Sequence, residues 1–217
     1  MRYALMLALL ASLPAFGESR KQLFNGKNMD GWKFVPRAEG EKGFSVSDGL
    51  IQTGGAKGML LYQGEKIGNA TIRVVYRMSN EKGNSGVFIR IPSVPTSETF
   101  AIHKGIEVQI DDRDDEWHCT GTLYSMTKAL ARPSKPAPEW NTMEITIDGL
   151  RTIVHVNGVL VTDYDGTGPV PERKKESEPE RGPRPEPGYI ALQNHDPSAD
   201  VSFKEVSVTP LKIKAKR

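Results

Sequence analysis

The segment "EITIDGLRTIVHVNGVLV", residues Glu144–Val161, decides the fold class. Apolar and polar residues alternate in each of its three pieces, which is the period-two pattern of a half-buried strand. The pieces are joined by "DG" at residues 148–149 and "NG" at residues 157–158. These dipeptides are the strongest short signals for hairpin turns, so the segment predicts three consecutive antiparallel strands.

Strand-like runs recur along the rest of the chain, with Gly, Asn or Pro between them. No long segment shows a convincing apolar stripe of helical period. The predicted strands are "GFSVSDGLIQT", "GMLLYQ", "ATIRVVYRM", "SGVFIRI", "GIEVQID", "GTLYSM", "NTMEITID", "RTIVHVN", "VLVTDYD", "GYIALQN" and "VSFKEVSVTPL". Many short strands without alternating helices predict an all-β protein, a jelly-roll β-sandwich of two antiparallel sheets.

The first 17 residues are typical of a secretory signal peptide. Met1 and Arg2 begin a short positive region, and the apolar run "ALMLALLASLPAF" that follows is too short to span a bilayer. Ala15 and Gly17 suit a cleavage site, so cleavage is expected after Gly17, with an uncleaved anchor as the alternative. This predicts a periplasmic or secreted protein, free of the membrane after cleavage, with a single domain at residues 18–217.

The composition limits the partners. The chain has 29 Lys and Arg against 27 Asp and Glu, a balance that predicts neither nucleic acid nor an anionic membrane as a partner. Cys119 is the single cysteine, so no intrachain disulfide can form and the core alone must supply stability. The sequence makes no prediction of an oligomeric state.

One segment differs from the rest in composition. Residues 166–188, "GTGPVPERKKESEPERGPRPEPG", are dense in Pro and in charges of both signs. Proline donates no backbone hydrogen bond, so this segment cannot be a central strand. It is interpreted either as a solvated loop between two strands or as a flap over one rim of the sandwich.

The stretch "GIEVQIDD", Gly105–Asp112, carries the first functional signal. One parity is apolar, whereas Glu107, Gln109 and Asp111 form an unbroken polar row on the other. By the same parity, Phe88 and Arg90 lie opposite Val87, Ile89 and Ile91, and Gln193 and His195 lie opposite Leu192 and Asn194. If these strands are neighbours, a cation, carboxylates, amides and an imidazole share one face, which suits a hydroxyl-rich ligand. Arg90 and Glu107 as an ordinary ion pair, and His195 as a turn residue, are the alternatives.

The chain also resembles the 3-keto-disaccharide hydrolase family, from about Gln22 to Leu211. The resemblance is carried by "LFNGKNMDGW", "NSGVFIR", "GIEVQIDD", "TGTLY", "EWNTMEITIDG", "HVNGVLV" and "GYIALQNHD...VSFKEVSV", in this order. It implies a concanavalin A-like jelly roll with a sugar site on the concave face. It also implies cleavage of glycosides whose glucose is oxidised at C3. Many relatives have Gly where this chain has Asp196, and "QNH" here contains Asn194, which is expected to matter little because it is on the opposite parity.

That chemistry requires three kinds of group. A base removes the acidic C2 proton, a cation or donor stabilises the enolate, and an acid protonates the leaving oxygen. Glu107 or His195 could be the base, and Arg90 suits the enolate oxygen. Asn84, Gln109 and Gln193 would bind hydroxyls, with Asp111 beside them. Tyr124 or Trp140 could form a stacking wall, with core packing as the alternative for Trp140.

Three alternatives remain open. No cofactor is firmly predicted, but a divalent metal bound by Glu107, Asp111 and His195 could replace Arg90 as the electrophile. A laminarinase-like glycosidase would use Glu107 and Asp111 as its two carboxylates, although their Cα atoms would be about 13 Å apart along a strand. A non-catalytic carbohydrate-binding module would use the same face without acid–base chemistry.

Overall fold

The structure is a computed structural model that describes residues 19–38, 42–176, 178–184, 187–196 and 201–212. The predicted signal peptide, residues 1–17, lies outside these ranges, so cleavage after Gly17 and a single mature domain at residues 18–217 stay predictions. In the described part of the chain, no helix is both long enough and apolar enough to cross a membrane.

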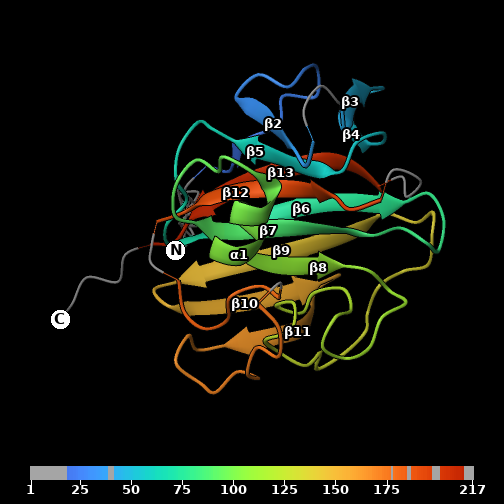
Figure 1. The fold of residues 1–217 in the computed structure, drawn as a ribbon. Helices are drawn as coiled ribbons and strands as arrows, with labels where there is room; N and C mark the ends of the chain where they lie inside the picture. Colours follow the sequence, from blue (N-terminus) through green and yellow to red (C-terminus); the bar gives the residue numbers. More distant parts are fainter. Residues whose placement is uncertain (1–18, 39–41, 177, 185–186, 197–200, 213–217) are drawn as a thin grey trace, which may run out of the picture.

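Two antiparallel sheets pack face to face, and one short helix covers part of the smaller sheet (Figure 1). The larger sheet has the order β11 (Val159–Tyr164), β10 (Arg151–Val156), β9 (Asn141–Asp148), β6 (Ala70–Met78), β13 (Val201–Pro210), β4 (Leu50–Thr53), β3 (Phe44–Ser47), with β1 (Lys21–Gln22) also on β13. The smaller sheet has the order β2 (Trp32–Pro36), β5 (Gly58–Tyr62), β12 (Tyr189–Asn194), β7 (Ser85–Ile91), β8 (Ile106–Ile110). The helix is α1 (Glu98–Lys104). The fold is the predicted all-β jelly roll.

The β9–β10–β11 meander forms as predicted, but its first turn is centred on Gly149 and Leu150, one residue later than the "DG" dipeptide. Asp148 pairs with Arg151 and Val156 pairs with Val159, so each connection is a two-residue hairpin loop. Asn157 and Gly158 both have positive φ, at 51° and 79°, which is the type I′ geometry that "NG" favours. This match between local sequence and turn type fixes the register of three strands in the larger sheet.

The main core lies between the two sheets and follows the predicted parity. In the smaller sheet, Ile106, Val108 and Ile110 face inward, and Ile145 and Ile147 face them from the larger sheet. All five are buried. Because a strand alternates its side chains, this inward row obliges the residues between them to lie on the outer face of the smaller sheet.

Helix α1 covers one end of that outer face. Ser97 caps the helix by accepting a hydrogen bond at Oγ from the Phe100 amide at 3.2 Å. A second apolar cluster forms beneath it, made of Val35, Met59, Leu61, Phe88, Ile91, Ala101 and Ala191. A seven-residue helix has too few turns for an apolar stripe to be visible in sequence, which is why the sequence did not predict it.

Arg90 is not on the outer face, so its predicted position beside Glu107 is wrong. Strands β7 and β12 change register between Ala191 and Tyr189, and Arg90 has a positive φ of 57°. This β-bulge inserts one residue and reverses the parity, so that Ile91 joins Phe88 on the outer face. The buried guanidinium instead donates from Nη2 to the carbonyl oxygens of Gly149 at 2.8 Å and Arg151 at 3.1 Å, on the β9–β10 hairpin.

The described residues of the Pro- and charge-rich segment, 166–176, 178–184 and 187–188, form a loop, as predicted, and this loop is bound to helix α1. Arg184 donates from Nε to the Lys104 carbonyl oxygen at 3.0 Å and from Nη2 to that of His103 at 3.3 Å. Lys104 also forms an ion pair with Glu180. The loop is therefore attached to the C-terminal end of α1, the helix that lies on the outer face.

Candidate functional site

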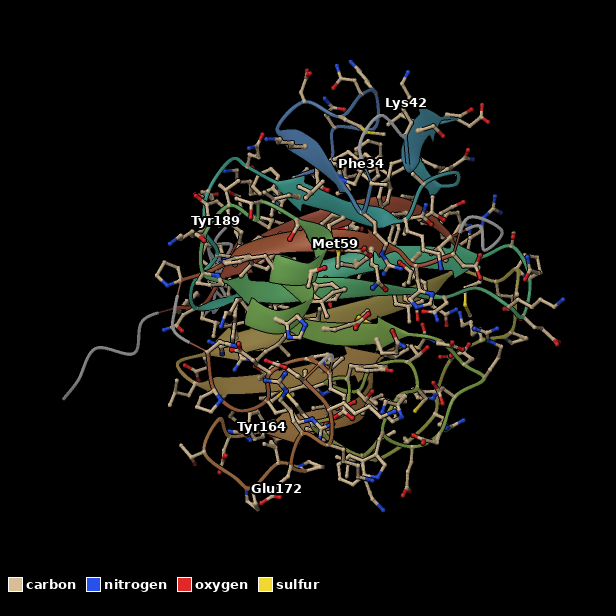
Figure 2. All side chains as sticks on the ribbon, in the orientation of Figure 1. Phe34, Lys42, Met59, Tyr164, Glu172 and Tyr189 are labelled. Carbon is tan, nitrogen blue, oxygen red and sulfur yellow. The ribbon has the colours of Figure 1, made fainter. Side chains whose placement is uncertain are left out.

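The strand register places polar side chains of β8 and β12 on the outer face, on either side of β7. Gln193 pairs with Met59 of β5, and Leu192 with Val87, so Gln193 neighbours Gly86 on the outer face. Gly86 in turn pairs with Gln109 of β8. Figure 2 shows Met59 near the middle of this face. The prediction that β8 and β12 contribute to one polar surface is thus confirmed, and β7 lies between them.

Glu107 lies one row closer to α1 and leans toward Gly86. A Cβ built on Gly86 would lie 2.4 Å from Glu107 Oε1 and 2.9 Å from its Cγ, so the carboxyl group occupies the space that a side chain would take. Burial, and after it the nearby charge of Glu98, raises the pKa of Glu107 to about 8. Glu107 is therefore mainly protonated at neutral pH and can act as an acid.

His195 follows β12 at the other end of the polar surface. Burial, followed by the positive charges of Lys57 and Arg37, lowers the pKa of its imidazole below the usual value. The ring is then neutral at neutral pH and able to accept a proton. The pKa values of His195 and Glu107 are shifted in opposite directions, so at neutral pH the first group can accept a proton and the second can donate one.

Sequence reasoning missed three charged residues of this surface: Arg37, Lys57 and Glu98. The Glu98 side chain is 1% exposed, and its Oε2 accepts a hydrogen bond from Arg37 Nε at 2.5 Å. Its Oε1 is buried without a hydrogen-bond partner among the described residues. Because Glu98 influences the pKa of both Glu107 and His195, it lies electrostatically within reach of both. The one available signal was "SETF", where Ser97 and Glu98 suit a helix start.

The predicted amides fall into two groups. Gln193 is 3% exposed, and its Oε1 lacks a hydrogen-bond partner within the described ranges, as does the buried Oδ1 of Asn84. Gln109 Oε1 accepts from the backbone amide of its neighbour Ile110 at 3.2 Å. Buried polar atoms are normally paired, so these two oxygens are exceptions. Both have almost no accessible surface, so the amide side chains must turn before they can accept a hydrogen bond from a ligand hydroxyl.

Asp111 is already occupied by another side chain. Arg113 donates from Nε to Oδ1 at 3.0 Å and from Nη2 to Oδ2 at 2.7 Å. Asp111, Glu107 and His195 do not bring ligand atoms together, so the predicted metal-ligand set does not form. Within the described residues, the one cluster of three ligand atoms within 4.8 Å of one another is Asp114, Asp115 and His118.

Tyr124 lies next to Glu107. The segment around "GTLY" runs along the free edge of β8, where Tyr124 N donates to the Glu107 carbonyl oxygen at 2.9 Å and Leu123 bridges Val108. The predicted "GTLYSM" strand is thus a single bridge and not a full strand. The Tyr124 ring packs on His118 with 4.6 Å between ring centroids. Burial, and then the charge of Glu107, raises the pKa of its hydroxyl.

Asn194 occupies the opposite face, as its parity predicts. Its Nδ2 donates to the carbonyl oxygens of Gly43 at 3.1 Å and Ala56 at 2.7 Å, between the sheets. It therefore supports the loops that flank β3 and β4 and does not contact the polar surface.

Comparison with known proteins identifies the family of this chain. The family model of the 3-keto-alpha-glucoside-1,2-lyase-like domain matches residues 19–209. This chain belongs to that family. The resemblance seen in its ordered motifs is therefore confirmed, and family membership supports a carbohydrate-active, hydrolase-like domain.

Individual relatives are distant. The chain is 24% identical over 167 residues to a 3-keto-disaccharide hydrolase of Bacteroides thetaiotaomicron, and the match covers 66% of this chain and 57% of that protein. The chain thus spans less than two thirds of the length of that relative.

Two solved structures show the same fold. One is a candidate glycosyl hydrolase of Parabacteroides distasonis, with a TM-score of 0.72 and 21% identity, over 89% of this chain and 94% of that one. The other is a Bacillus subtilis protein with a galectin-like fold, with a TM-score of 0.62 and 12% identity, over 88% of this chain and 94% of that one. At these identities the likeness establishes the jelly roll alone.

Proposed function

We propose that this protein cleaves the glycosidic bond of 3-keto-glycosides by elimination followed by hydration, with His195 as the base and Glu107 as the acid. The observation that carries the proposal is the opposite displacement of their pKa values on one polar surface. The family description and the name of the Bacteroides relative support the substrate class.

The two groups are spaced for a sugar between them. His195 and Glu107 lie two strands and four residues apart by register, which puts their Cα atoms on the order of 16 Å apart. Both side chains extend several ångströms over the face, and Glu107 leans toward Gly86 between them. A pyranose ring fits the remaining gap, with its C2 hydrogen toward His195 and its C1 oxygen toward Glu107.

The steps balance as follows. Neutral His195 takes the C2 proton, the C1–O bond breaks as a C1=C2 double bond forms, and protonated Glu107 gives its proton to the departing oxygen. Water then adds OH to C1 and H to C2, so the net reaction is hydrolysis. Acid and base groups placed in this way each accelerate such a step by about 10²–10⁴-fold.

The enolate oxygen needs a positive partner other than Arg90. Arg90 is bound to the carbonyl oxygens of the β9–β10 hairpin, on the far side of the smaller sheet from Glu107. Lys57 and Arg37 are the cations whose charges act on His195. We assign Lys57 to the C3 oxygen, because Arg37 is paired with Glu98.

An ordinary glycosidase is a second candidate, favoured by the electrostatic contact between Glu98 and Glu107. In that reaction, protonated Glu107 would be the acid and Glu98 the carboxylate partner. The laminarinase-like pair of Glu107 and Asp111 has less support, because Arg113 binds both oxygens of Asp111. A sugar-binding module would use the same unpartnered oxygens of Gln193 and Asn84 without turnover.

The first experiment compares purified protein on methyl and p-nitrophenyl glucosides and on their 3-keto derivatives, with and without a chelator. Release of the leaving group from the 3-keto-glucosides alone supports the proposal, and release from the unoxidised glucosides supports the ordinary glycosidase. Sugar binding without release supports a non-catalytic sugar-binding module. Loss of activity with chelator would replace Lys57 by a metal as the electrophile.

Two variants then separate acid from base. Glu107→Gln should lose about 100-fold or more on the methyl keto-glucoside but much less on the p-nitrophenyl one, whose leaving oxygen needs no acid. It should also keep the exchange of the C2 hydrogen with deuterated solvent. His195→Gln should lose that exchange on both substrates. The reverse pattern would exchange the two roles.

A further inference from the structure

A groove of about 970 Å³ lies beside the free edge of the smaller sheet, next to Glu107. One wall is the segment after β8, with Trp117, His118 and Tyr124, and the other is the 166–188 loop, including Lys174 and Pro179. The volume is at the upper end of the range for small-molecule sites. The activity proposed above requires space for one sugar ring over the sheet, and it leaves this groove unassigned.

The aromatic wall is held in place by hydrogen bonds. His118 Nδ1 lies 2.7 Å from Asp115 Oδ1, and its Nε2 lies 3.0 Å from Ser125 Oγ. The Tyr124 ring packs on the imidazole. The half-buried Trp117 is bound through its backbone, which donates to Asp115 Oδ1 at 2.8 Å and accepts from the Ser125 amide at 3.1 Å. The Trp117 backbone and the His118 and Tyr124 rings are thus fixed, and Lys128 Nζ lies 5.3 Å from the centroid of the Trp117 ring.

The loop wall is fixed as well. Arg181 donates from Nη1 to the carbonyl oxygens of Pro171 and Glu172, each at 2.7 Å, and from Nη2 to Glu178 Oε2 at 2.7 Å. Figure 2 shows Glu172 of this loop at the bottom of the molecule. The Nζ of Lys174 and the carboxylate of Glu172 have no side-chain partner among the described residues, so both can serve a ligand.

The groove meets the reaction site at Tyr124. The backbone of Tyr124 is bonded to that of Glu107, and the charge of Glu107 reaches the Tyr124 hydroxyl. Under the proposed function, Glu107 protonates the departing oxygen. The leaving part of the substrate therefore extends beyond Glu107, away from His195, which is the direction of the groove.

We infer that this groove binds the leaving group, and that the leaving group is a saccharide stacked against Trp117. Aromatic faces bind the C–H surface of a sugar ring, while a wall with both donors and acceptors suits its hydroxyls. A flat aryl leaving group would use the rings but would leave Lys174 and Glu172 without a partner. This inference rests on the proposed function for the direction of the substrate, and on the groove itself for the chemistry of the ligand.

The kinetic test compares three 3-keto-glucosides with methyl, p-nitrophenyl and sugar leaving groups. Trp117→Ala should lower kcat/KM at least about 10-fold on the keto-disaccharide relative to the methyl glycoside, and Trp117→Phe should restore most of it. Trp140→Ala is the matched control, because Trp140 packs against Arg77 and Lys204 away from the groove. An equal loss on the methyl and sugar substrates would overturn the inference, and a loss confined to the p-nitrophenyl substrate would make the site aryl-specific.

A second test measures sugar binding to the groove and does not depend on turnover. Free disaccharide should change the tryptophan fluorescence of the wild type and of the Trp140→Ala variant but not of Trp117→Ala. No change at saturating sugar in the Trp140→Ala variant would overturn the inference even if the keto-glycosides are cleaved. A change without cleavage of any keto-glycoside would keep the groove as a sugar site and refute the proposed function.

Discussion

Replacing Gly86 by Ala should displace the Glu107 carboxyl group and leave the fold intact. Gly86 is buried near the start of β7, where its backbone is in a conformation that any residue adopts. The added Cβ would lie 2.4 Å from Glu107 Oε1, 2.9 Å from Cγ and 3.1 Å from Cδ. Ordinary contact begins at 3.4 Å. The flexible end of Glu107 must therefore move by about 1 Å, because the backbone of β7 cannot.

A displacement of about 1 Å in a catalytic group can reduce the rate about 100-fold. We expect Gly86→Ala to lower kcat on methyl 3-keto-glucoside by 10- to 100-fold, with a smaller effect on KM. The loss should be smaller on the p-nitrophenyl substrate, because that leaving group does not depend on the acid. The assay is release of the leaving group under saturating substrate, with circular dichroism and thermal unfolding measured alongside.

Two controls decide the reasoning. Gly68→Ala adds the same methyl group where the nearest atom is Pro187 Cβ at 3.6 Å, and it should leave kcat unchanged. In a Glu107→Gln background, Gly86→Ala should have little further effect, since the two changes act through one group. If Gly86→Ala lowers activity equally with and without Glu107, or leaves wild-type activity intact, the assigned role of Glu107 is wrong.

Four further predictions follow from the site and its scaffold. The kcat/KM value should rise with pH as His195 loses its proton, at a pH below the usual imidazole pKa, and it should fall near pH 8 as Glu107 loses its proton. Glu107→Gln should abolish the alkaline fall. If the fall persists in this variant, another group is responsible for it. Arg90→Met should reduce the free energy of unfolding by about 2–4 kcal/mol in urea titrations, because it leaves buried carbonyl oxygens without their donor; a change under 1 kcal/mol would contradict this. Asn157→Ala should reduce the free energy of unfolding by about 1–3 kcal/mol, and Asn157→Gly should reduce it less. Both variants lose the hydrogen bond from the Thr142 amide, but glycine tolerates the positive φ at this position. Equal reductions would exclude backbone strain as a cause. Cys119 is 1% exposed and burial raises the pKa of its thiol, so thiol reagents should label the native protein roughly 100-fold more slowly than the urea-unfolded chain; similar rates would show that the site opens readily.

Much of the fold could be predicted because local and tertiary preferences agree. The "NG" dipeptide at residues 157–158 specifies its hairpin turn by itself, and "DG" at residues 148–149 predicts the first turn to within one residue. The parity of β8 assigns Glu107 and Gln109 to the outer face without knowledge of any neighbour. The same parity reasoning placed Gln193 correctly, since β12 is regular between Ala191 and Asn194.

The errors arise where tertiary structure overrides the local pattern. Nothing in "SGVFIRI" marks a bulge, because Arg90 is not a residue type that favours positive φ. Its conformation is stabilised by acceptors on a hairpin about sixty residues away in sequence. Glu98 was missed for a related reason. Its burial depends on where α1 lies on the sheet, and a short helix start does not reveal which surface it faces.

Helix α1 also sets a length. Its first residue, Glu98, lies at the polar surface, and its last, Lys104, forms an ion pair with Glu180 of the loop that lines the groove. Seven residues at 1.5 Å per residue make a rigid spacer of about 10 Å between the two. Under the proposed function, the length of α1 sets the distance between Glu98 and the groove, so relatives with one more or one fewer turn at this position should select leaving groups of a different size.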